Sequence, residues 1–221
     1  MGKLIVIEGL DGSGKSTQLE LLPAALKKRG IDCRTVSFPD YESDSSALIK
    51  MYLGGKFGDK PTDVNAYAAS TFYAVDRFAS YKTNWGEFYN NGGTVIAGRY
   101  VTSNAVHQTS KLEKDKWEAF LDWLYDFEYN KIGIPAPDKV IFLDMPTDVS
   151  QKLLKNRYEG DDSKKDIHEK DKAYLDRCRE AALFTAQYSG WSIISCGEKG
   201  EPRSIEAIAE DILTEVLKEY A

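Results

Sequence analysis

The amino-acid sequence predicts an α/β fold, in which helices flank both faces of a parallel β-sheet of about five strands. Short runs rich in Val, Ile and Leu alternate with longer segments of helical periodicity along the chain, and this alternation is typical of parallel sheets that are buried on both sides. With 221 residues and 42% hydrophobic composition, the chain can bury a sizeable core, and we expect residues 1–221 to form a single domain.

The expected strands and helices follow one another in turn. The β-branched apolar runs that indicate strands are residues 3–8, 33–38, 94–97, 139–143 and 191–195. Helical patterns cover residues 15–29, 65–89, 113–130 and 204–220, and a further helix is expected to open at Thr147 as its N-cap. A polar loop is expected at residues 40–46. Pro23 lies inside the first helix, where it predicts a kink or a local break.

Residues 156–172, which read NRYEGDDSKKDIHEKDK, are dense in charge and nearly free of aliphatic side chains. Such a composition provides no apolar face to bury against a core. We therefore expect this segment to be solvated and mobile, and to interrupt two helices.

A phosphate-binding motif joins the first strand to the first helix in residues 5–17, IVIEGLDGSGKST. Gly9, Gly14, Lys15 and Ser16 satisfy the pattern G-x-x-x-x-G-K-[ST]. In this pattern backbone N–H groups surround phosphate oxygens, the lysine bridges the β- and γ-phosphates, and the hydroxyl ligates magnesium. The motif predicts a P-loop NTPase fold that binds a nucleoside triphosphate with Mg2+. The expected nucleotide-binding residues are Gly9, Asp11, Gly12, Ser13, Gly14, Lys15, Ser16 and Thr17, with Ser16 as the metal ligand.

Two other nucleotide-binding classes do not fit the sequence. The glycines do not follow the G-x-G-x-x-G spacing of dinucleotide-binding folds. A GTPase would carry Asn-Lys-x-Asp after a late strand, but Asn130-Lys131 is followed by Ile132 and Gly133, ahead of any such strand. A kinase that acts on a small acceptor is therefore favoured.

Composition excludes several partners. A net charge of -6 and an isoelectric point near 5.1 argue against the broad basic face that holds nucleic acid. No apolar run approaches the roughly 18 residues that a membrane span needs, and the first residues enter a strand pattern rather than a signal peptide. We expect a cytoplasmic protein without nucleic-acid or membrane partners, whose three cysteines, Cys33, Cys178 and Cys196, are reduced and structural.

Five segments together resemble the thymidylate kinase family, and the resemblance runs nearly end to end. They are the phosphate-binding segment, FPDY (38–41), FYAVDRF (72–78), GRYVTSNAVHQ (98–108) and the charged stretch near residue 160. The resemblance implies a P-loop kinase that phosphorylates dTMP to dTDP with Mg-ATP. It also implies a homodimer, for which the helix at residues 65–89 is a plausible interface, and a lid over about residues 156–172.

Several residues have the chemistry that an acceptor nucleotide needs. Tyr73 and Arg77 are four apart, so on a helix they share one face and offer a ring and a donor fork to a pyrimidine base. The resemblance assigns stacking on thymine to Tyr73 and its O4 to Arg77. It implies that Asn104 and Gln108, which are also four apart, face the base, and that Arg99 grips the dTMP phosphate.

Further roles follow only from the resemblance. It places Phe38 against the base or sugar, Tyr100 beside Arg99 in the acceptor site, and His107 on the 2′ side of the sugar, where it excludes ribonucleotides. Asp11 matches an acid near the acceptor phosphate and the 3′-hydroxyl. The expected catalytic residues are Lys15, Arg99, Asp11 and Arg157.

The sequence departs from the family pattern in three places. Gly98 stands where an aspartate precedes the arginine and helps to organise magnesium, so Asp144 or Asp11 is expected to compensate in part. Asp40 and Glu42 lie where several members carry an arginine, and acids there would weaken phosphate binding. The phosphate loop carries no arginine. Lid closure is therefore expected to supply a positive charge from Arg157, Lys164 or Lys165.

Two alternatives stay open at this point. A deoxynucleoside kinase shares the opening segment, but it needs a carboxylate base after the second strand, for which Asp40 or Glu42 are candidates. A nucleotide-binding homologue that has lost catalysis is the second alternative, and Gly98 favours it.

Overall fold

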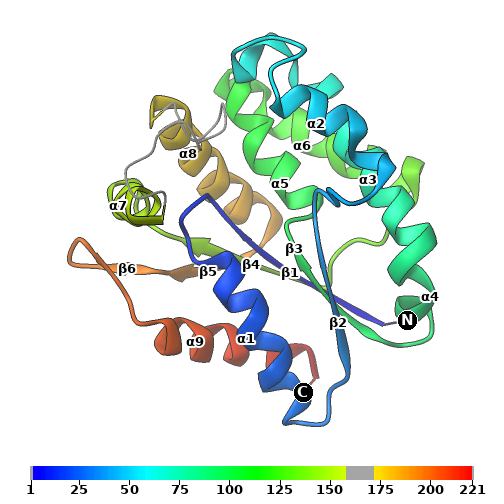
Figure 1. The fold of residues 1–221 in the computed structure, drawn as a ribbon, viewed down its shortest axis with the longest axis vertical. Helices are drawn as coiled ribbons and strands as arrows, with labels where there is room; N and C mark the ends of the chain where they lie inside the picture. Colours follow the sequence, from blue (N-terminus) through cyan, green and yellow to red (C-terminus); the bar gives the residue numbers. More distant parts are fainter. Residues whose placement is uncertain (1, 158–171, 221) are drawn as a thin grey trace.

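The computed structural model describes residues 2–157 and 172–220, in which five parallel strands form one twisted sheet (Figure 1). The strand order is β2-β3-β1-β4-β5. Their bounds are β1 Lys3–Gly9, β2 Cys33–Ser37, β3 Thr94–Gly98, β4 Lys139–Asp144 and β5 Ser192–Ser195. All five predicted strands are confirmed, each within one residue at either end. A short antiparallel hairpin, β6 Gly197–Glu198 and β7 Glu201–Pro202, was not expected.

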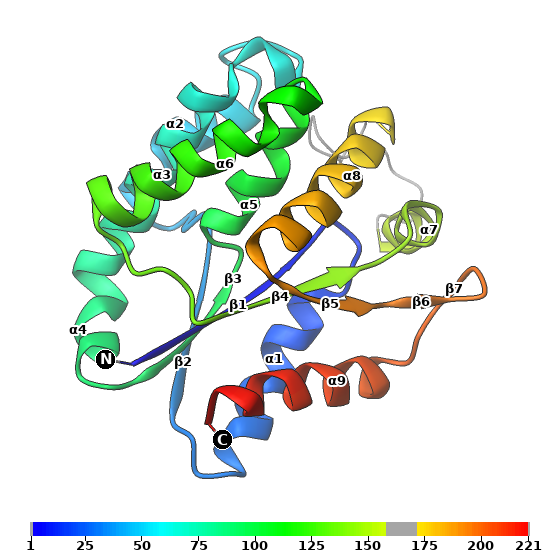
Figure 2. The ribbon, with the colours of Figure 1, turned by 180° about the vertical axis from the view of Figure 1, so that it is seen from behind.

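Helices cover both faces of the sheet, as predicted (Figures 1 and 2). Their bounds are α1 Lys15–Lys27, α2 Ala47–Leu53, α3 Ala66–Ser80, α4 Gly86–Asn90, α5 Val101–His107, α6 Trp117–Tyr125, α7 Thr147–Arg157, α8 Lys172–Ser189 and α9 Ile205–Leu217. Short 3-10 turns lie at Asp44–Ser46, Pro61–Asp63, Thr109–Lys111, Lys114–Lys116 and Lys218–Tyr220. In the described ranges, no helix combines the length and the hydropathy that a membrane crossing requires.

The alternation of side chains along β1 divides the core into two layers. Leu4 and Val6 pack in the cluster formed with α5 and α6, whereas Ile5 and Ile7 pack in the cluster formed with α1 and α9. All four side chains are fully buried, because β1 is the central strand and both of its faces are covered. The β-branched run that predicted this strand is therefore explained by burial on both sides.

Two predicted helices continue through wider π-turns. The helix expected at residues 65–89 consists of α3, a π segment at Tyr81–Trp85, and α4. The helix expected at residues 113–130 begins with α6 and ends in a π segment at Asp126–Ile132. Such π-turns shift the helical phase by a fraction of a turn and are frequent next to functional sites.

Three local predictions of secondary structure differ from the structure. Helix α1 runs through Pro23 without the expected break, because Leu22 and Leu26 on either side are buried against the sheet and proline removes only one backbone hydrogen bond. Thr147 is the first helical residue of α7 rather than its cap. The loop expected at residues 40–46 ends in a 3-10 turn that leads into α2, which was not predicted.

Candidate active site

The site lies where β1 and β3 end, at the carboxyl edge of the sheet, which is where open α/β sheets bind ligands. Two hollows adjoin there. One is a groove of about 380 Å³ along the phosphate loop, and the other is a cavity of about 200 Å³ beneath α3 and α5. Asp11 and Arg99 line both hollows, so the wall between them is made of one acid and one base.

The phosphate loop has the backbone shape that its motif predicts. Gly12 and Gly14 adopt positive φ angles of 77° and 88°, and Gly14 is the N-cap of α1. A Cβ on Gly12 would lie 2.8 Å from the carbonyl oxygen of Ser150 in α7, so the loop needs glycine there for a close approach. In the described chain no side chain caps α1, which leaves its first N–H groups to an anion.

Lys15 and Ser16 flank the groove. The Lys15 ammonium donates to the carbonyl oxygens of Gly9 at 2.6 Å and Leu10 at 2.8 Å, and lies 4.0 Å from an Asp11 oxygen. The Ser16 side chain is exposed. No group of three or more His, Cys, Asp or Glu side chains within the described ranges could hold a metal. The donors present, one hydroxyl beside a phosphate-binding loop, fit Mg2+ that arrives with a nucleotide and keeps its water and phosphate ligands.

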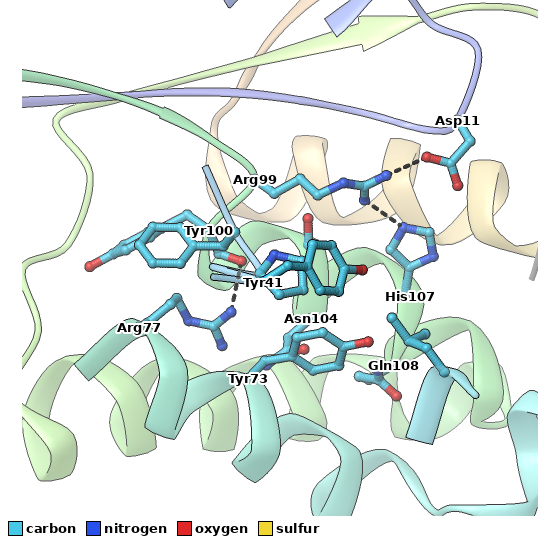
Figure 3. A pocket seen from close by; sticks show the side chains of 13 residues that line it. Asp11, Tyr41, Tyr73, Arg77, Arg99, Tyr100, Asn104, His107 and Gln108 are labelled. Carbon is cyan, nitrogen blue, oxygen red and sulfur yellow. Dashed lines mark hydrogen bonds and ion pairs between the residues drawn. The ribbon is translucent and has the colours of Figure 1, made fainter. Parts of the chain in front are cut away.

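The cavity gathers all eight residues that were predicted to bind the acceptor (Figure 3). Its lining is Asp11, Phe38, Pro39, Tyr41, Leu53, Tyr73, Arg77, Arg99, Tyr100, Ser103, Asn104, His107 and Gln108. Tyr73 and Arg77 come from α3, as their spacing predicted, and Asn104 and His107 come from α5 with Gln108 as its C-cap. Residues that lie up to 97 positions apart in the sequence, Asp11 and Gln108, thus face one hollow.

Arg77 is buried and neutralised by an acid that the sequence reasoning missed. Its Nε donates to Oε2 of Glu128 at 2.8 Å, Nη2 pairs with the other carboxylate oxygen, and Nη1 donates to the carbonyl oxygen of Tyr100 at 3.2 Å. The Glu128 carboxylate also accepts from Asn104 Nδ2 at 3.2 Å. Because the pair is buried, this end of the cavity offers fixed hydrogen-bonding groups without a net charge.

Arg99 contrasts with Arg77 in conformation and surroundings. It adopts a positive φ of 64°, which is uncommon outside glycine and is typical of functional sites. One guanidinium nitrogen pairs with Asp11 and another lies 3.3 Å from Nε2 of His107. Burial alone would lower the pKa of Arg99, but the carboxylates of Asp11 and Glu8 outweigh it and raise the pKa above its usual range. Arg99 therefore carries a permanent positive charge into the site.

Glu8 is a second buried acid that was not predicted. Its Oε1 accepts from the N–H of Gly9 at 2.9 Å, and its Oε2 accepts from the hydroxyls of Thr102 and Ser103, both at 2.7 Å. The carboxylate thereby joins the first residue of the phosphate loop to the start of α5. Its position directly before Gly9 is the signal that could have suggested a role.

The space beside Gly98 is filled by an apolar side chain. A Cβ at this position would lie 2.2 Å from Cδ1 of Leu19, so the leucine of α1 occupies the volume that a larger residue would need. Asp144 does not take over, since it forms a bidentate pair with Arg179 of α8 at 2.8 and 2.9 Å, and it lines neither hollow. Of the two acids expected to compensate, only Asp11 lies at the site.

The loop after β2 places an aromatic ring, and not its two acids, at the cavity. Tyr41 is part of the lining, whereas Asp40 and Glu42 are absent from the described lining residues. The buried Asp76 of α3 anchors this loop, because its carboxylate accepts from the Asp40 N–H at 2.9 Å and the Ser45 hydroxyl at 2.6 Å. The two acids therefore do not line the cavity, and their effect on phosphate binding stays a prediction. Asp76 directly precedes Arg77 in the segment FYAVDRF, and this position is the sequence signal that could have suggested its role.

The predicted lid over about residues 156–172 draws on three cations. Arg157 is the last residue of α7, while Lys164 and Lys165 lie outside the described residues. The lid assignment of these three cations stays a prediction.

Comparisons with known proteins agree with this geometry. The sequence model described as thymidylate kinase matches residues 7–212. The chain is 30% identical to the thymidylate kinase of Mycobacterium tuberculosis over 190 residues, which are 85% of this chain and 87% of that protein. It is 30% identical to the thymidylate kinase of Homo sapiens over 145 residues, which are 65% of this chain and 61% of that protein.

Among solved structures, the thymidylate kinase of Candida albicans shares the fold. It superposes with a TM-score of 0.71 at 22% identity, over 99% of this chain and 92% of that one. The matched residues 7–212 contain the phosphate loop and every residue that lines the cavity. The chain therefore belongs to the thymidylate kinase family and is a nucleoside monophosphate kinase.

Proposed function

We propose that this enzyme transfers the γ-phosphoryl group of ATP, bound with Mg2+, to dTMP and releases dTDP and ADP. The observation that carries the proposal is the polarity of the acceptor cavity. Its Arg77 end is buried and neutralised by Glu128, whereas its Arg99 end is partly exposed to solvent, pairs with Asp11 and opens onto the phosphate loop. A nucleoside monophosphate has the same polarity, with an uncharged base and an anionic phosphate.

The base end suits a pyrimidine that has both acceptors and a donor. Arg77 and Asn104 bring N–H groups to this end, and Tyr73 brings a ring on which a base can stack. The buried Oε1 of Gln108 has no hydrogen-bond partner among the described residues. This oxygen would accept a hydrogen bond from the N3–H of thymine. The bond would be favourable, because a buried acceptor without a partner is costly.

The phosphate end supplies charge. Arg99 would grip the acceptor phosphate, Phe38 and Tyr100 would pack against the base or sugar, and His107 would lie beside the sugar. Asp11 pairs with Arg99 at the boundary between the two hollows. We assign Asp11 to the orientation of Arg99 and to the sugar 3′-hydroxyl.

The transfer needs position and charge rather than a strong base. An oxygen of the dTMP phosphate, already an anion, attacks the γ-phosphorus in line, the bond to the β–γ bridging oxygen breaks, and ADP leaves. Lys15 moves from the loop carbonyls to the phosphates and neutralises charge, and Arg99 neutralises the acceptor. Ser16 would hold Mg2+ together with the nucleotide, whose charge the ion offsets.

The cavity also bears on the two alternatives. A deoxynucleoside kinase needs a carboxylate beside the 5′-hydroxyl, and neither Asp40 nor Glu42 is found among the described lining residues. A homologue without catalysis is disfavoured, because Lys15, Ser16 and Arg99 all line the groove at the phosphate loop. The monophosphate kinase remains the better-supported function.

The first test is ADP release with Mg-ATP against dTMP, dUMP, dCMP, dGMP, AMP and thymidine. Selective turnover of dTMP supports the proposal. Turnover of thymidine without dTMP would assign the enzyme to the nucleoside kinases. Nucleotide binding without turnover of any acceptor would overturn the proposal and would indicate that Gly98 causes the loss of catalytic activity.

We also propose that the enzyme is a homodimer that pairs through α3. Tyr67, Val75 and Phe78 are exposed large apolar side chains on this helix, and their spacing places them on one face. Sedimentation at micromolar concentration should give twice the chain mass, and Val75→Glu should reduce it to one chain. A monomeric wild type would exclude the dimer.

A further inference from the structure

His107 lies between the phosphate-binding arginine and helix α8. Its side chain is nearly buried at the end of α5. The Nε2 atom is 3.3 Å from Nη1 of Arg99, and the Nδ1 atom is 3.6 Å from the Sγ of Cys178. Figure 3 marks the contact with Arg99 by a dashed line. The imidazole therefore bridges a residue of the active site and a residue of α8, 71 positions further along the chain.

The chemistry of these partners determines where the ring proton lies. A guanidinium has N–H donors only, so Nε2 of His107 must accept the hydrogen bond from Arg99 and carries no proton. A neutral imidazole then holds its proton on Nδ1, and this N–H points at the sulfur of Cys178. A doubly protonated ring would instead place a second cation against Arg99.

Helix α8 holds both the ring and the backbone of His107. Tyr174 donates its hydroxyl to the His107 carbonyl oxygen at 3.2 Å, and Ser110 donates to the same oxygen at 2.9 Å. The Ser110 hydroxyl also lies 3.3 Å from Cys178 Sγ. Burial raises the pKa of Cys178 to about 11, so the sulfur stays a neutral thiol and a weak acceptor at physiological pH.

We propose that His107, as the neutral Nδ1–H tautomer held by Cys178, is a positioning residue that orients the Arg99 guanidinium for the acceptor phosphate. This inference rests on the proposed function of Arg99. One guanidinium nitrogen is held by His107 and another by Asp11, so its plane is set before a phosphate arrives. Such preorganisation lowers the entropic cost of gripping the anion. The role differs from the exclusion of ribonucleotides, since it acts through Arg99.

Two substitutions of His107 test the roles of its two ring nitrogens independently. In His107→Gln the side-chain oxygen can reach the Nε2 position and accept from Arg99, whereas His107→Asn reaches only the Nδ1 position. A hydrogen bond to a charged group is worth roughly 1.5–3 kcal/mol, so the KM for dTMP should rise about tenfold or more in His107→Asn. His107→Gln should recover most of that loss, and the KM for ATP should stay constant in both variants.

The outcomes distinguish this inference from the proposed function. If the wild type does not use dTMP, the proposed function fails first. If the wild type uses dTMP and both variants have the same KM for dTMP, the positioning role is overturned. Cys178→Ser, which keeps an acceptor, is expected to resemble the wild type more closely than Cys178→Ala.

Nitrogen NMR tests the tautomer without any assay of activity. The chain has two histidines, His107 and His168, so His168→Gln leaves only the signals of His107. At neutral pH we expect a protonated Nδ1 and an unprotonated Nε2. A ring protonated on Nε2, or on both nitrogens, would contradict the proposal even if the His107 and Cys178 variants failed to fold.

Discussion

Arg77 and Arg99 stand at the two ends of one cavity, and their surroundings give one residue type two functions. Arg77 is 1% exposed and shares its charge with the buried Glu128. The Arg99 side chain is 23% exposed, as is that of its partner Asp11, and its backbone is held at a positive φ. The first arginine is a fixed hydrogen-bonding surface, and the second is a charge that can be shared with an arriving anion. This difference suits an uncharged base at one end and a phosphate at the other.

The largest effect on activity should follow removal of the Arg99 charge at the phosphate end. Arg99→Ala should lower kcat/KM for dTMP by about a thousandfold, because a positioned charge at a phosphoryl-transfer site contributes on that scale. Thermal stability should change little. Arg99→Lys keeps the charge but not the fork, and is expected to lie between the two. Steady-state kinetics that show equal activity in all three proteins would refute the assignment of the phosphate to this end.

Breaking the pair at the other end should instead affect folding. Glu128→Gln leaves Arg77 buried without its counter-charge, and should lower the free energy of unfolding by about 3 kcal/mol. Urea denaturation measures this change. The double variant Arg77→Met, Glu128→Leu should recover most of the stability while dTMP use stays low. A stable Glu128→Gln protein would mean that the two ends do not differ as described.

A carboxylate at position 98 would add a second acid beside Arg99, next to its existing partner Asp11. Gly98→Asp places a Cβ against Leu19 and should cost about 2 kcal/mol of stability, whereas Gly98→Asp with Leu19→Ala should relieve most of that cost. Calorimetric melting compares the two proteins. An equal loss in both would show that Leu19 is not the obstacle. The activity of the double variant then tests whether Gly98 limits the rate.

A third cation, Lys111, sharpens the comparison, because it is partly buried among neutral partners. Its ammonium donates to the Tyr52 hydroxyl at 2.8 Å and to the Val64 carbonyl oxygen at 3.1 Å. Burial lowers the pKa of Lys111 from 10.5 to about 8. Between these values the unfolded chain binds more protons than the folded chain, so the stability contributed by this group rises with pH.

The expected slope of the free energy of unfolding is about 1 kcal/mol per pH unit across that window. Unfolding free energies measured from neutral to alkaline pH in wild type and Lys111→Met isolate the contribution of this side chain. The variant should show the flatter curve. Parallel curves would mean that Lys111 titrates alike in both states.

Much of the site could be predicted because its signals are local. The phosphate loop is a contiguous strand, turn and helix, so spacing alone placed Gly14, Lys15 and Ser16 around the groove. Tyr73 and Arg77 share a helical face for the same reason. The order of strands and helices also follows from periodicity, since it reflects burial on both faces of the sheet.

Other features depended on segments that are far apart in the sequence. Glu128 meets Arg77 across 51 positions, and Leu19 fills the space beside Gly98 although the two lie on different elements. Asp144 pairs with Arg179 of α8 and is thereby kept out of the site. No periodicity encodes these pairings, because they arise when independently formed elements pack at a particular distance and angle.

The sequence by itself thus determined the fold class and the phosphate loop, because both depend on residues that are near neighbours along the chain. The inventory of the acceptor site came from the resemblance of the sequence to thymidylate kinases. Only the tertiary structure decided which charges are neutralised and which remain available. That distinction depends on burial and on distances between elements, and it separates Arg77, held by Glu128, from Arg99, held by Asp11 and His107. The sequence therefore supplies the side chains of the site, and packing determines which of their charges are buried in ion pairs.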